Sequence, residues 1–440
     1  MKEMKDSGID WIEQIPKHWE VKRLKDLAEF GSGTTPKSSN EKYYEDGDIP
    51  WLITGDVQNK LVTENKVNIT ELALKENPNL KQYPINTVLL AMYGGGTIGN
   101  VGVMTYPAYI NQACCAMIPN KNTFAKFLFY YLLTKQGRII STGVGGTQIN
   151  LSQNKISAYP IAIPPLSEQQ QIADYLDKKT GEIDTQISLL KQQKDTYARL
   201  KRSLINEVIT RGLNPNAEFK DSGVEWIGEI PKHWEVNRLK DLAYLYPGLT
   251  GKAGDDFFPE QENGTKPYIP FTNVFNNFEI NPKALMYVRM SDDECQNKVK
   301  KNDLIFLMSS EDYDAIAKSS LVSKDLGEVY LNSFCRGLRF TSKSIYPKFI
   351  NYQLLAETCR DALRFEARGF TRINIKIDKI TSHIVFLPPL SEQQQIADYL
   401  DEKTAEIDKN ISLIEKKIET YKRFKQSLID EMVTGKRSIN

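Results

Sequence analysis

The sequence contains one long pattern twice. Residues 6–28 read DSGIDWIEQIPKHWEVKRLKDLA and residues 221–243 read DSGVEWIGEIPKHWEVNRLKDLA, so 18 of 23 positions are identical. The word PPLSEQQQIADYLD then occurs unchanged at residues 164–177 and 388–401. Identity over such lengths means that one architecture occurs in two tandem copies. Each copy begins and ends alike.

The stretches between the repeated blocks, about 29–163 and 244–387, share only short anchors in the same order. The anchor pairs are 49–51 with 269–271, 109–114 with 330–335, 126–138 with 348–360, and 145–150 with 369–374. Most anchored positions are apolar, aromatic, Pro or Gly, which are the residues that fix a fold, whereas the polar positions between them differ. We therefore expect one fold that carries two different surfaces.

Each middle stretch is predicted to be an α+β domain. Residues 87–92 form an apolar run, Tyr93 and three glycines interrupt it, and residues 100–104 resume it, which indicates short strands joined by turns. Near the end of each middle, residues 124–140 and 347–367 have apolar residues at helical spacing. Gly369 stands where the second of these helices is expected to end.

Each PPLSEQQ word predicts the start of a long helix, because the paired prolines break the preceding segment and Ser167 offers a cap. Apolar residues then recur in a heptad seam between charged flanks. The seam residues are Ile183, Ile187, Leu190, Tyr197, Leu200, Leu204 and Val208, followed in the second copy by Ile407, Ile411, Ile414, Ile418, Tyr421, Phe424, Leu428 and Met432. Two helices of about 43 residues, roughly 65 Å long, are expected to pack as an antiparallel coiled coil with an internal pseudo-twofold axis and the domains at opposite ends.

This pattern predicts four parts. Residues 1–163 form the first domain with its start block, 164–213 the central helix, 214–387 the second domain, and 388–440 the final helix. A chain of 440 residues with 40% apolar and 26% charged residues is long enough for two or three separate cores. It has no apolar stretch of membrane-spanning length and no signal-peptide core at its start, so a cytoplasmic protein is expected.

Motifs for catalysis or metal binding are weak. Residues 94–99 match GxGxxG in form, but a strand-like segment follows and no acid occurs between Val101 and Ser167, so we interpret them as a turn. No P-loop is present, and Leu follows the paired prolines where an amino-methyltransferase motif needs an aromatic residue. Asp56 with residues 64–66 imitates a D…ExK nuclease site, which we interpret as solvated surface. The five cysteines form no CxxC pair, so neither zinc nor disulfides are predicted.

Net charge is only +1, so composition alone does not predict nucleic-acid binding. Arginines at 360, 364, 368 and 372 advance by four. Such a line suits phosphate contact, but pairing with the acids at 357, 361 and 366 explains it equally well.

The segments TQxN at 147–150 and TRxN at 371–374 lie just before the long helices, and Gln, Asn and Arg can read base edges with two hydrogen bonds. A structural cap is the alternative for Thr147 and Asn150, whereas Gln148 and Arg372 differ between the copies and are better candidates for reading bases. The candidate DNA-binding residues are Thr147, Gln148, Asn150, Arg364, Arg368, Arg372 and Asn374.

The two divergent domains, the two long helices that open with PPLSEQQQIA and the start WIxxIPxHW resemble the specificity subunits of type I restriction-modification systems. The likeness covers nearly the whole chain. It implies that each middle is a target-recognition domain reading one half of a split site in the DNA major groove. It also implies that the helices space the two domains and dock two methyltransferase subunits.

The same resemblance implies that this chain is not an enzyme and holds no cofactor. S-adenosylmethionine, ATP and Mg are then expected on the methyltransferase and restriction (translocase) subunits of the full complex. The target is expected to be double-stranded DNA with an asymmetric two-part sequence. Two alternatives stay open: a single-chain DNA methyltransferase or nuclease, and a coiled-coil interaction scaffold that does not bind DNA.

Overall fold

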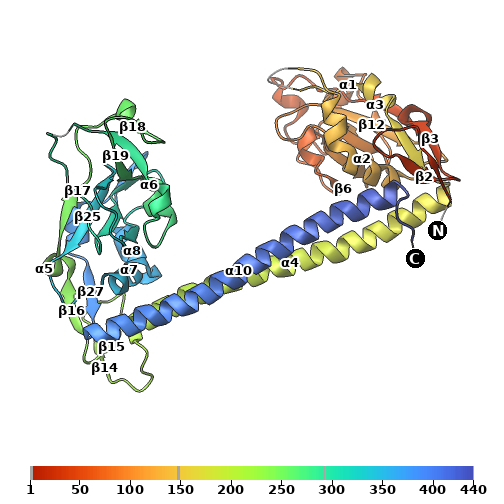
Figure 1. The fold of residues 1–440 in the computed structure, drawn as a ribbon. Coiled ribbons are helices and arrows are strands. Elements are labelled where there is room, and N and C mark those ends of the chain that lie inside the picture. The colour runs from red at the N-terminus through yellow and green to blue at the C-terminus, as the bar shows by residue number, and fades with distance from the viewer. Residues whose placement is uncertain (1–2, 146–148, 292, 440) are drawn as a thin grey trace. The chain divides into compact units, whose positions relative to one another are not determined.

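The chain folds into two compact units. The computed structural model describes residues 3–145, 149–291 and 293–439 (Figure 1). Unit 1 consists of Met1–Lys191 with Lys416–Asn440, and unit 2 of Gln192–Glu415. Each unit thus contains one globular domain, the first half of one long helix and the second half of the other. Among the described residues, no helix has both the length and the apolar character needed to cross a bilayer.

Unit 1 is a mixed α/β domain. Its strands are β1 (Met4–Asp6), β2 (Gln14–Pro16), β3 (Glu20–Arg23), β4 (Ala28–Ser32), β5 (Ile49–Leu52), β6 (Lys60–Val62), β7 (Val67–Ile69), β8 (Gln82–Tyr83), β9 (Val88–Ala91), β10 (Val101–Met104), β11 (Ala108–Ile110), β12 (Cys114–Pro119) and β13 (Pro160–Ile163). Its helices are α1 (Glu71–Glu76), α2 (Ala125–Ser141) and α3 (Gln153–Ser157), with parts of α4 (Leu166–Arg211) and α10 (Leu390–Val433). The main sheets have the orders β4-β12-β9-β10-β6 and β7-β5-β11-β8.

Unit 2 repeats this framework. Its strands are β14 (Phe219–Asp221), β15 (Glu229–Pro231), β16 (Glu235–Arg238), β17 (Ala243–Pro247), β18 (Phe257–Phe258), β19 (Thr265–Ile269), β20 (Met286–Arg289), β21 (Leu304–Leu307), β22 (Ser309–Ser310), β23 (Ser319–Leu321), β24 (Tyr330–Leu331), β25 (Cys335–Phe340), β26 (Ile373–Asn374) and β27 (Ile384–Leu387). Its helices are α5 (Leu239–Leu242), α6 (Phe271–Asn276), α7 (Pro347–Leu355), α8 (Glu357–Phe365) and α9 (Ile377–Thr381). The sheet order β17-β25-β21-β23 corresponds to β4-β12-β9-β10, and β20-β19-β24 corresponds to β7-β5-β11.

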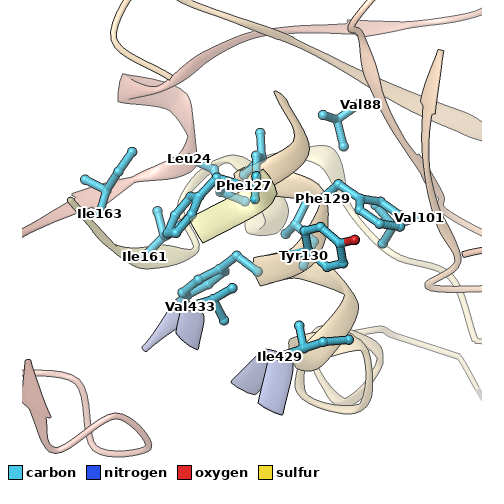
Figure 2. Packing of buried hydrophobic residues seen from close by; sticks show 14 of the residues in the cluster. Leu24, Val88, Val101, Phe127, Phe129, Tyr130, Ile161, Ile163, Ile429 and Val433 are labelled. Carbon is cyan, nitrogen blue, oxygen red and sulfur yellow. The ribbon is translucent and has the colours of Figure 1, made fainter. Parts of the chain in front are cut away.

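The core of unit 1 lies between the larger sheet, α2 and the end of α10. Strand β9 is apolar at every position because both its faces are covered: Val88 and Leu90 face the cluster around α2, while Leu89 belongs to a second cluster. Figure 2 shows Phe127, Phe129 and Tyr130 of α2 together with Val88 and Val101 of the sheet and Ile429 and Val433 of α10. The last turns of α10 are therefore part of this core.

The repeated sequence blocks recur because they touch each other. In unit 1, Nε2 of His18 from the start block lies 2.7 Å from Oε2 of Glu168 in the PPLSEQ word. In unit 2, His233 and Glu392 make the same contact at 2.7 Å. The start block is thereby fixed to the first turn of a long helix in both units.

The first glutamine of each PPLSEQQ word secures the beginning of its helix. The side chain of Gln169 is buried, accepts a hydrogen bond from the Phe124 amide at 2.8 Å and donates to the Pro164 carbonyl at 2.9 Å. Gln393 makes the equivalent bonds to Tyr346 and Pro388 at 2.8 and 2.9 Å. Because Phe124 and Tyr346 precede α2 and α7, this glutamine joins the start of the long helix to the start of the domain helix.

A half-buried carboxylate makes the next connection. Asp177 accepts hydrogen bonds from Lys126 and Tyr130 of α2 at 2.5 and 2.7 Å. In unit 2, Lys348 and Tyr352 of α7 bind Asp401 at 2.8 and 2.6 Å. These contacts explain why the anchor K-F-x-x-Y recurs in two middles that otherwise differ.

The long helices α4 and α10 contain 46 and 44 residues and run antiparallel. Within unit 2, Lys194 binds Glu415 at 3.1 Å and Lys201 binds Asp408 at 2.6 Å, so residue numbers rise along one helix as they fall along the other. In unit 1 the equivalent pair, Lys425 with Asp184, also lies at 2.6 Å. These contacts give the antiparallel direction within each unit.

Most predicted seam residues face inward, but two do not. The buried or half-buried ones are Ile183, Ile187, Leu190, Tyr197, Leu204, Val208, Ile407, Ile411, Ile414, Ile418, Tyr421, Leu428 and Met432. The prediction was wrong for Leu200 and Phe424, which are 52% and 47% exposed. Their neighbours Lys201 and Lys425 are half-buried instead, and each holds a carboxylate of the opposite helix.

The helix predicted over residues 347–367 is in fact two helices, α7 and α8. Ala356 between them is extended, with φ −64° and ψ 145°. The break has a tertiary cause, since the Glu357 amide donates to Oδ1 of Asn206 in α4 at 2.9 Å instead of continuing the helix. The expected end at Gly369 was also wrong: α8 ends at Phe365, and Gly369 lies in the following loop. Helix α2 is unbroken, as predicted for residues 124–140.

Removal of either member of the ion pair between Lys135 in α2 and Asp430 in α10 is expected to destabilise unit 1 unequally. Nζ of Lys135 lies 2.5 Å from Oδ1 of Asp430, and the two side chains are 7% and 38% exposed. Asp430→Ala leaves the buried Lys135 ammonium without its acceptor and should lower the free energy of unfolding by about 1–3 kcal/mol, whereas Lys135→Met should cost less. Urea denaturation of both variants and of the double variant measures the coupling. Lys425→Met, which breaks a more exposed pair, is the control and should cost under about 1 kcal/mol; an equal loss in all variants would contradict this.

Candidate nucleic-acid interface

Three loops meet at one end of the sheet β17-β25-β21-β23 in unit 2. They are residues 309–317 after β21, 332–334 between β24 and β25, and 368–374 between α8 and α9. Met308 links them, because its amide donates to the Phe334 carbonyl at 3.0 Å and its carbonyl accepts from the Ile375 amide at 3.1 Å. Strand β22 also pairs with β26, with Ser310 opposite Ile373. We refer to these residues as the three-loop surface of unit 2.

Unit 1 has the equivalent surface, formed in the described part of the chain by residues 93–99, 111–113, 144–145 and 149–150. Met92 has the place of Met308: its amide donates to Ala113 at 2.8 Å and its carbonyl accepts from Leu151 at 2.9 Å. The third loop is closed in both units by a backbone bridge, Val144 with Asn150 and Arg368 with Asn374. The two surfaces therefore share a framework and differ in side chains.

Large apolar side chains are exposed on both surfaces. Those at least 40% exposed are Phe370 at 105%, Val144 at 66%, Tyr313 at 49%, Phe334 at 41% and Ile149 at 41%, with Phe365 at 73% on the adjoining end of α8. Scattered single apolar residues are ordinary on protein surfaces, but a cluster of this kind indicates an interaction site. Sequence reasoning missed these aromatic residues, although the run FEARGFTR at 365–372 alternates them with arginines.

The four arginines predicted as one basic line have different environments. Arg360 is buried and donates to the carbonyl oxygens of Ile316 and Asp314, both at 2.8 Å. Burial lowers the pKa of Arg360 to about 10, so the guanidinium stays charged at neutral pH. Arg364 pairs with Asp314 and Asp361, both at 3.1 Å. These two arginines thus hold α8 against the loop at 309–317.

Arg368 and Arg372 lie in the loop and are exposed. The Arg368 guanidinium lies 5.8 Å from the ring centre of Phe365, and that of Arg372 lies 4.5 Å from the ring centre of Phe334. Such cation–π contacts fix the direction of a guanidinium while leaving its N–H edges available. Nη1 of Arg368 also donates to the carbonyl oxygens of Phe365 and, at 2.8 Å, of Ala367, which ties this guanidinium to its own backbone. The Arg372 guanidinium is held on the Phe334 ring and keeps its N–H groups for a ligand.

The remaining predicted contacts lie in the third loops. Asn374 is exposed, and its Nδ2 donates to the Arg372 carbonyl at 3.1 Å, so its side chain supports the loop. Asn150 is exposed and its backbone bridges Val144. The candidates Thr147 and Gln148 lie outside the described residues.

Two weak motifs have structural explanations. The glycine segment 94–99 is a turn followed by strand β10, as predicted, and not the opening of a helix. The prediction of solvated surface was wrong for Asp56, which is buried, accepts a hydrogen bond from the Ile53 amide at 2.9 Å and has its pKa raised by burial. Within the described part of the chain, no group of three or more His, Cys, Asp or Glu residues could hold a metal ion.

Comparison with known proteins assigns this framework. The family model described as type I restriction modification DNA specificity domain matches residues 16–195 and again residues 231–420. The chain belongs to this family. A DNA specificity domain thus occurs twice, once from each copy of the repeat, and the predicted fold class of tandem recognition domains with long helices is confirmed.

Relatives match along almost the full chain. The MjaIX type I restriction enzyme specificity subunit of Methanocaldococcus jannaschii is 26% identical, with 96% of this chain and 94% of that protein covered. The EcoKI specificity subunit of Escherichia coli K12 is 20% identical, covering 96% and 90%. A chain of a solved type I R-M system has a TM-score of 0.73 at 16% identity, covering 96% of this chain and 99% of that one. The HsdS subunit from Thermoanaerobacter tengcongensis has a TM-score of 0.57 at 15% identity, covering 96% and 98%.

Substitutions along the arginine line should separate stability from DNA binding. Arg360→Met leaves the buried Ile316 carbonyl and the Asp314 carbonyl without their donor and should lower the free energy of unfolding by about 1–3 kcal/mol. Arg368→Ala and Arg372→Ala should change it by less than about 0.5 kcal/mol, because both side chains are exposed. Urea denaturation measures the free energy of unfolding of each variant, and retention of DNA by the complex with its partners measures DNA binding. Loss of DNA binding in Arg360→Met alone would reverse the assignment.

Proposed function

We propose that the chain recognises an asymmetric two-part DNA sequence, with each unit reading one half, and that it catalyses no reaction itself. The observation that carries this proposal is the repeated three-loop surface. Its framework is the same in both units, but unit 1 presents glycines with Val144 and Ile149, whereas unit 2 presents Phe370 and Arg372. One framework with two different sets of exposed side chains suits two different short base sequences.

The long helices support a partner role. Exposed apolar residues recur at equivalent positions of α4 and α10: Leu189 with Leu413 and Leu200 with Phe424 are each 47–52% exposed. Unit 1 contains Leu189 and Phe424, and unit 2 contains Leu413 and Leu200, so each unit offers one matched pair. Two equivalent apolar sites suit two copies of one protein.

We infer that the two copies are methyltransferase subunits, because the relatives are specificity subunits of type I restriction enzymes. S-adenosylmethionine, ATP and Mg are then held by the methyltransferase and restriction subunits. A net charge of +1 suits a chain that shares phosphate contacts with its partners and binds DNA weakly alone.

Exchange of residues 244–387 for the middle of another family member is expected to change one half of the recognised sequence and leave the other half unaltered. The reason is that this segment contains the whole three-loop surface of unit 2 and none of that of unit 1. Mapping the methylated bases in a host genome before and after the exchange measures both halves at once. The reciprocal exchange of residues 29–163 is the control. A change in both halves, or in neither, would contradict the assignment of one half to each unit.

A charge at one apolar helix site should remove one partner copy. Leu189→Asp and Leu413→Asp should each reduce the complex from two methyltransferase copies to one, and the double variant should bind none. Native mass spectrometry of the purified complex counts the copies. The neighbouring exposed serines give matched controls, since Ser188→Asp and Ser412→Asp add the same charge one residue away. Retention of two copies by the double leucine variant would exclude these leucines as docking sites.

A further inference from the structure

The loop at 368–374 holds a phenylalanine at its tip in a fixed conformation. The Arg368 amide donates to Asn374 at 2.9 Å, and the Asn374 amide donates back to Arg368 at 2.8 Å, which closes the loop at its base. Gly369 has φ +143°, and a Cβ there would collide with the Arg372 carbonyl oxygen, so this turn needs glycine. The loop is therefore tightly folded, and Phe370 projects from it.

Phe370 is 105% exposed, which means that its ring has no cover from the rest of the chain. A phenylalanine gains free energy when it is covered, so a fully exposed one at a fixed tip indicates that a ligand covers it. Arg368 and Arg372 flank it two residues away on either side, and no acidic residue of the described chain pairs with them, although Nη1 of Arg368 donates to the carbonyl oxygens of Phe365 and Ala367. A ligand that fits this loop therefore has an apolar group that covers Phe370 and negative or acceptor groups on either side of it.

Double-stranded DNA is an anionic ligand, and only its major groove offers this loop both room and an apolar group to contact. The major groove is about 12 Å wide and admits a two-stranded β-ribbon of a protein, whereas the minor groove is only about 6 Å wide. The bridged strands of the loop at 368–374 suit the wider groove. On the major-groove edges of the four bases, the one methyl group is the 5-methyl of thymine; cytosine has only a C5–H at that position, and the other recognition groups are hydrogen-bond donors or acceptors.

We propose that Phe370 reads a thymine by contact with its 5-methyl group in the major groove, in the half of the sequence that unit 2 recognises. This inference rests on the proposed function of unit 2. The two flanking arginines place the loop, by contacts with phosphates or a neighbouring guanine. The first copy has Gly146 at the equivalent position, so the same contact is not expected in the other half of the sequence.

The test replaces thymine by uracil, which pairs identically but lacks the methyl group. The complex of the full chain with its methyltransferase partners is titrated with duplexes of the mapped sequence in which one thymine at a time is changed. One position in the unit 2 half should lose about fourfold in affinity, the effect of one buried methyl group. The Phe370→Ala complex should bind the thymine and uracil duplexes equally, and Phe370→Leu should keep part of the preference.

Three controls make the outcome specific. Phe365→Ala alters another exposed ring outside the loop tip and should keep the full thymine preference. Arg372→Ala should lower the affinity of the complex for the thymine and uracil duplexes by the same factor. Thymine-to-uracil changes in the unit 1 half should affect the wild-type and Phe370→Ala complexes alike.

Several results would overturn the inference. One is a unit 2 half-site without an A·T pair; another is an undiminished thymine preference in the Phe370→Ala complex; a third is equal binding of all uracil duplexes by the wild type. In each case the wild-type complex would still bind its own sequence in preference to unrelated DNA. Failure of that preference would instead refute the proposed function.

Discussion

Neither unit can complete its hydrophobic core without the end of a long helix that starts in the other copy of the repeat. Ile429, Met432 and Val433 of α10 are buried in the core of unit 1, and Val208 and Ile209 of α4 are buried in the core of unit 2. Each of these side chains is at most 5% exposed, and burial of such residues contributes on the order of 1.5–3 kcal/mol apiece. Because these contacts are needed for folding, they also determine that the helices run antiparallel.

This dependence explains which parts of the repeat are alike. The start block, the first turn of the long helix and the domain helix contact one another through His18, Glu168 and Asp177, and through their equivalents in unit 2. A change in one partner would leave the other without its hydrogen bond or ion pair, which lowers stability. The three-loop surfaces are joined to the framework largely through backbone groups, such as those of Met92 and Met308, so their side chains can differ without loss of the fold.

The two units differ in the charges at the contact between the domain helix and the end of the long helix, although the repeats are otherwise alike. In unit 1, Lys135 binds Asp430, whereas in unit 2 the corresponding acid Glu357 lies 3.6 Å from Arg202 and its amide binds Asn206. The domain helix thus carries a positive charge at this position in unit 1 and a negative charge in unit 2. The end of the long helix that it contacts carries the opposite charge in each case, Asp430 in unit 1 and Arg202 in unit 2. Each domain helix therefore favours the end of its own long helix over the end of the other one. This opposes incorrect pairing of domains with helix ends.

Local sequence patterns predicted the elements, and tertiary contacts determined the exceptions. The heptad seam identified both long helices, because its period is a property of the helix itself. The break at Ala356 depends on Asn206, about 150 residues away, and the burial of Arg360 depends on carbonyl groups in the loop at 314–316. Full exposure of Phe370 contradicts the usual expectation that phenylalanine is buried, and such departures from the hydrophobic pattern mark functional positions.

The charges on unit 2 make base contacts more important than phosphate contacts. Arg364 is paired with Asp314 and Asp361, so it adds little net attraction for a polyanion. Arg360 is buried and bound to backbone carbonyl groups, so its guanidinium cannot contact a phosphate directly. Arg368 and Arg372 remain, and each phosphate contact contributes a slope of only about 0.9 to the dependence of binding on salt. A surface with so few free charges binds any duplex weakly. Discrimination between sequences must then come from short-range contacts at the loop tips, which agrees with the proposal that partner subunits supply further phosphate contacts.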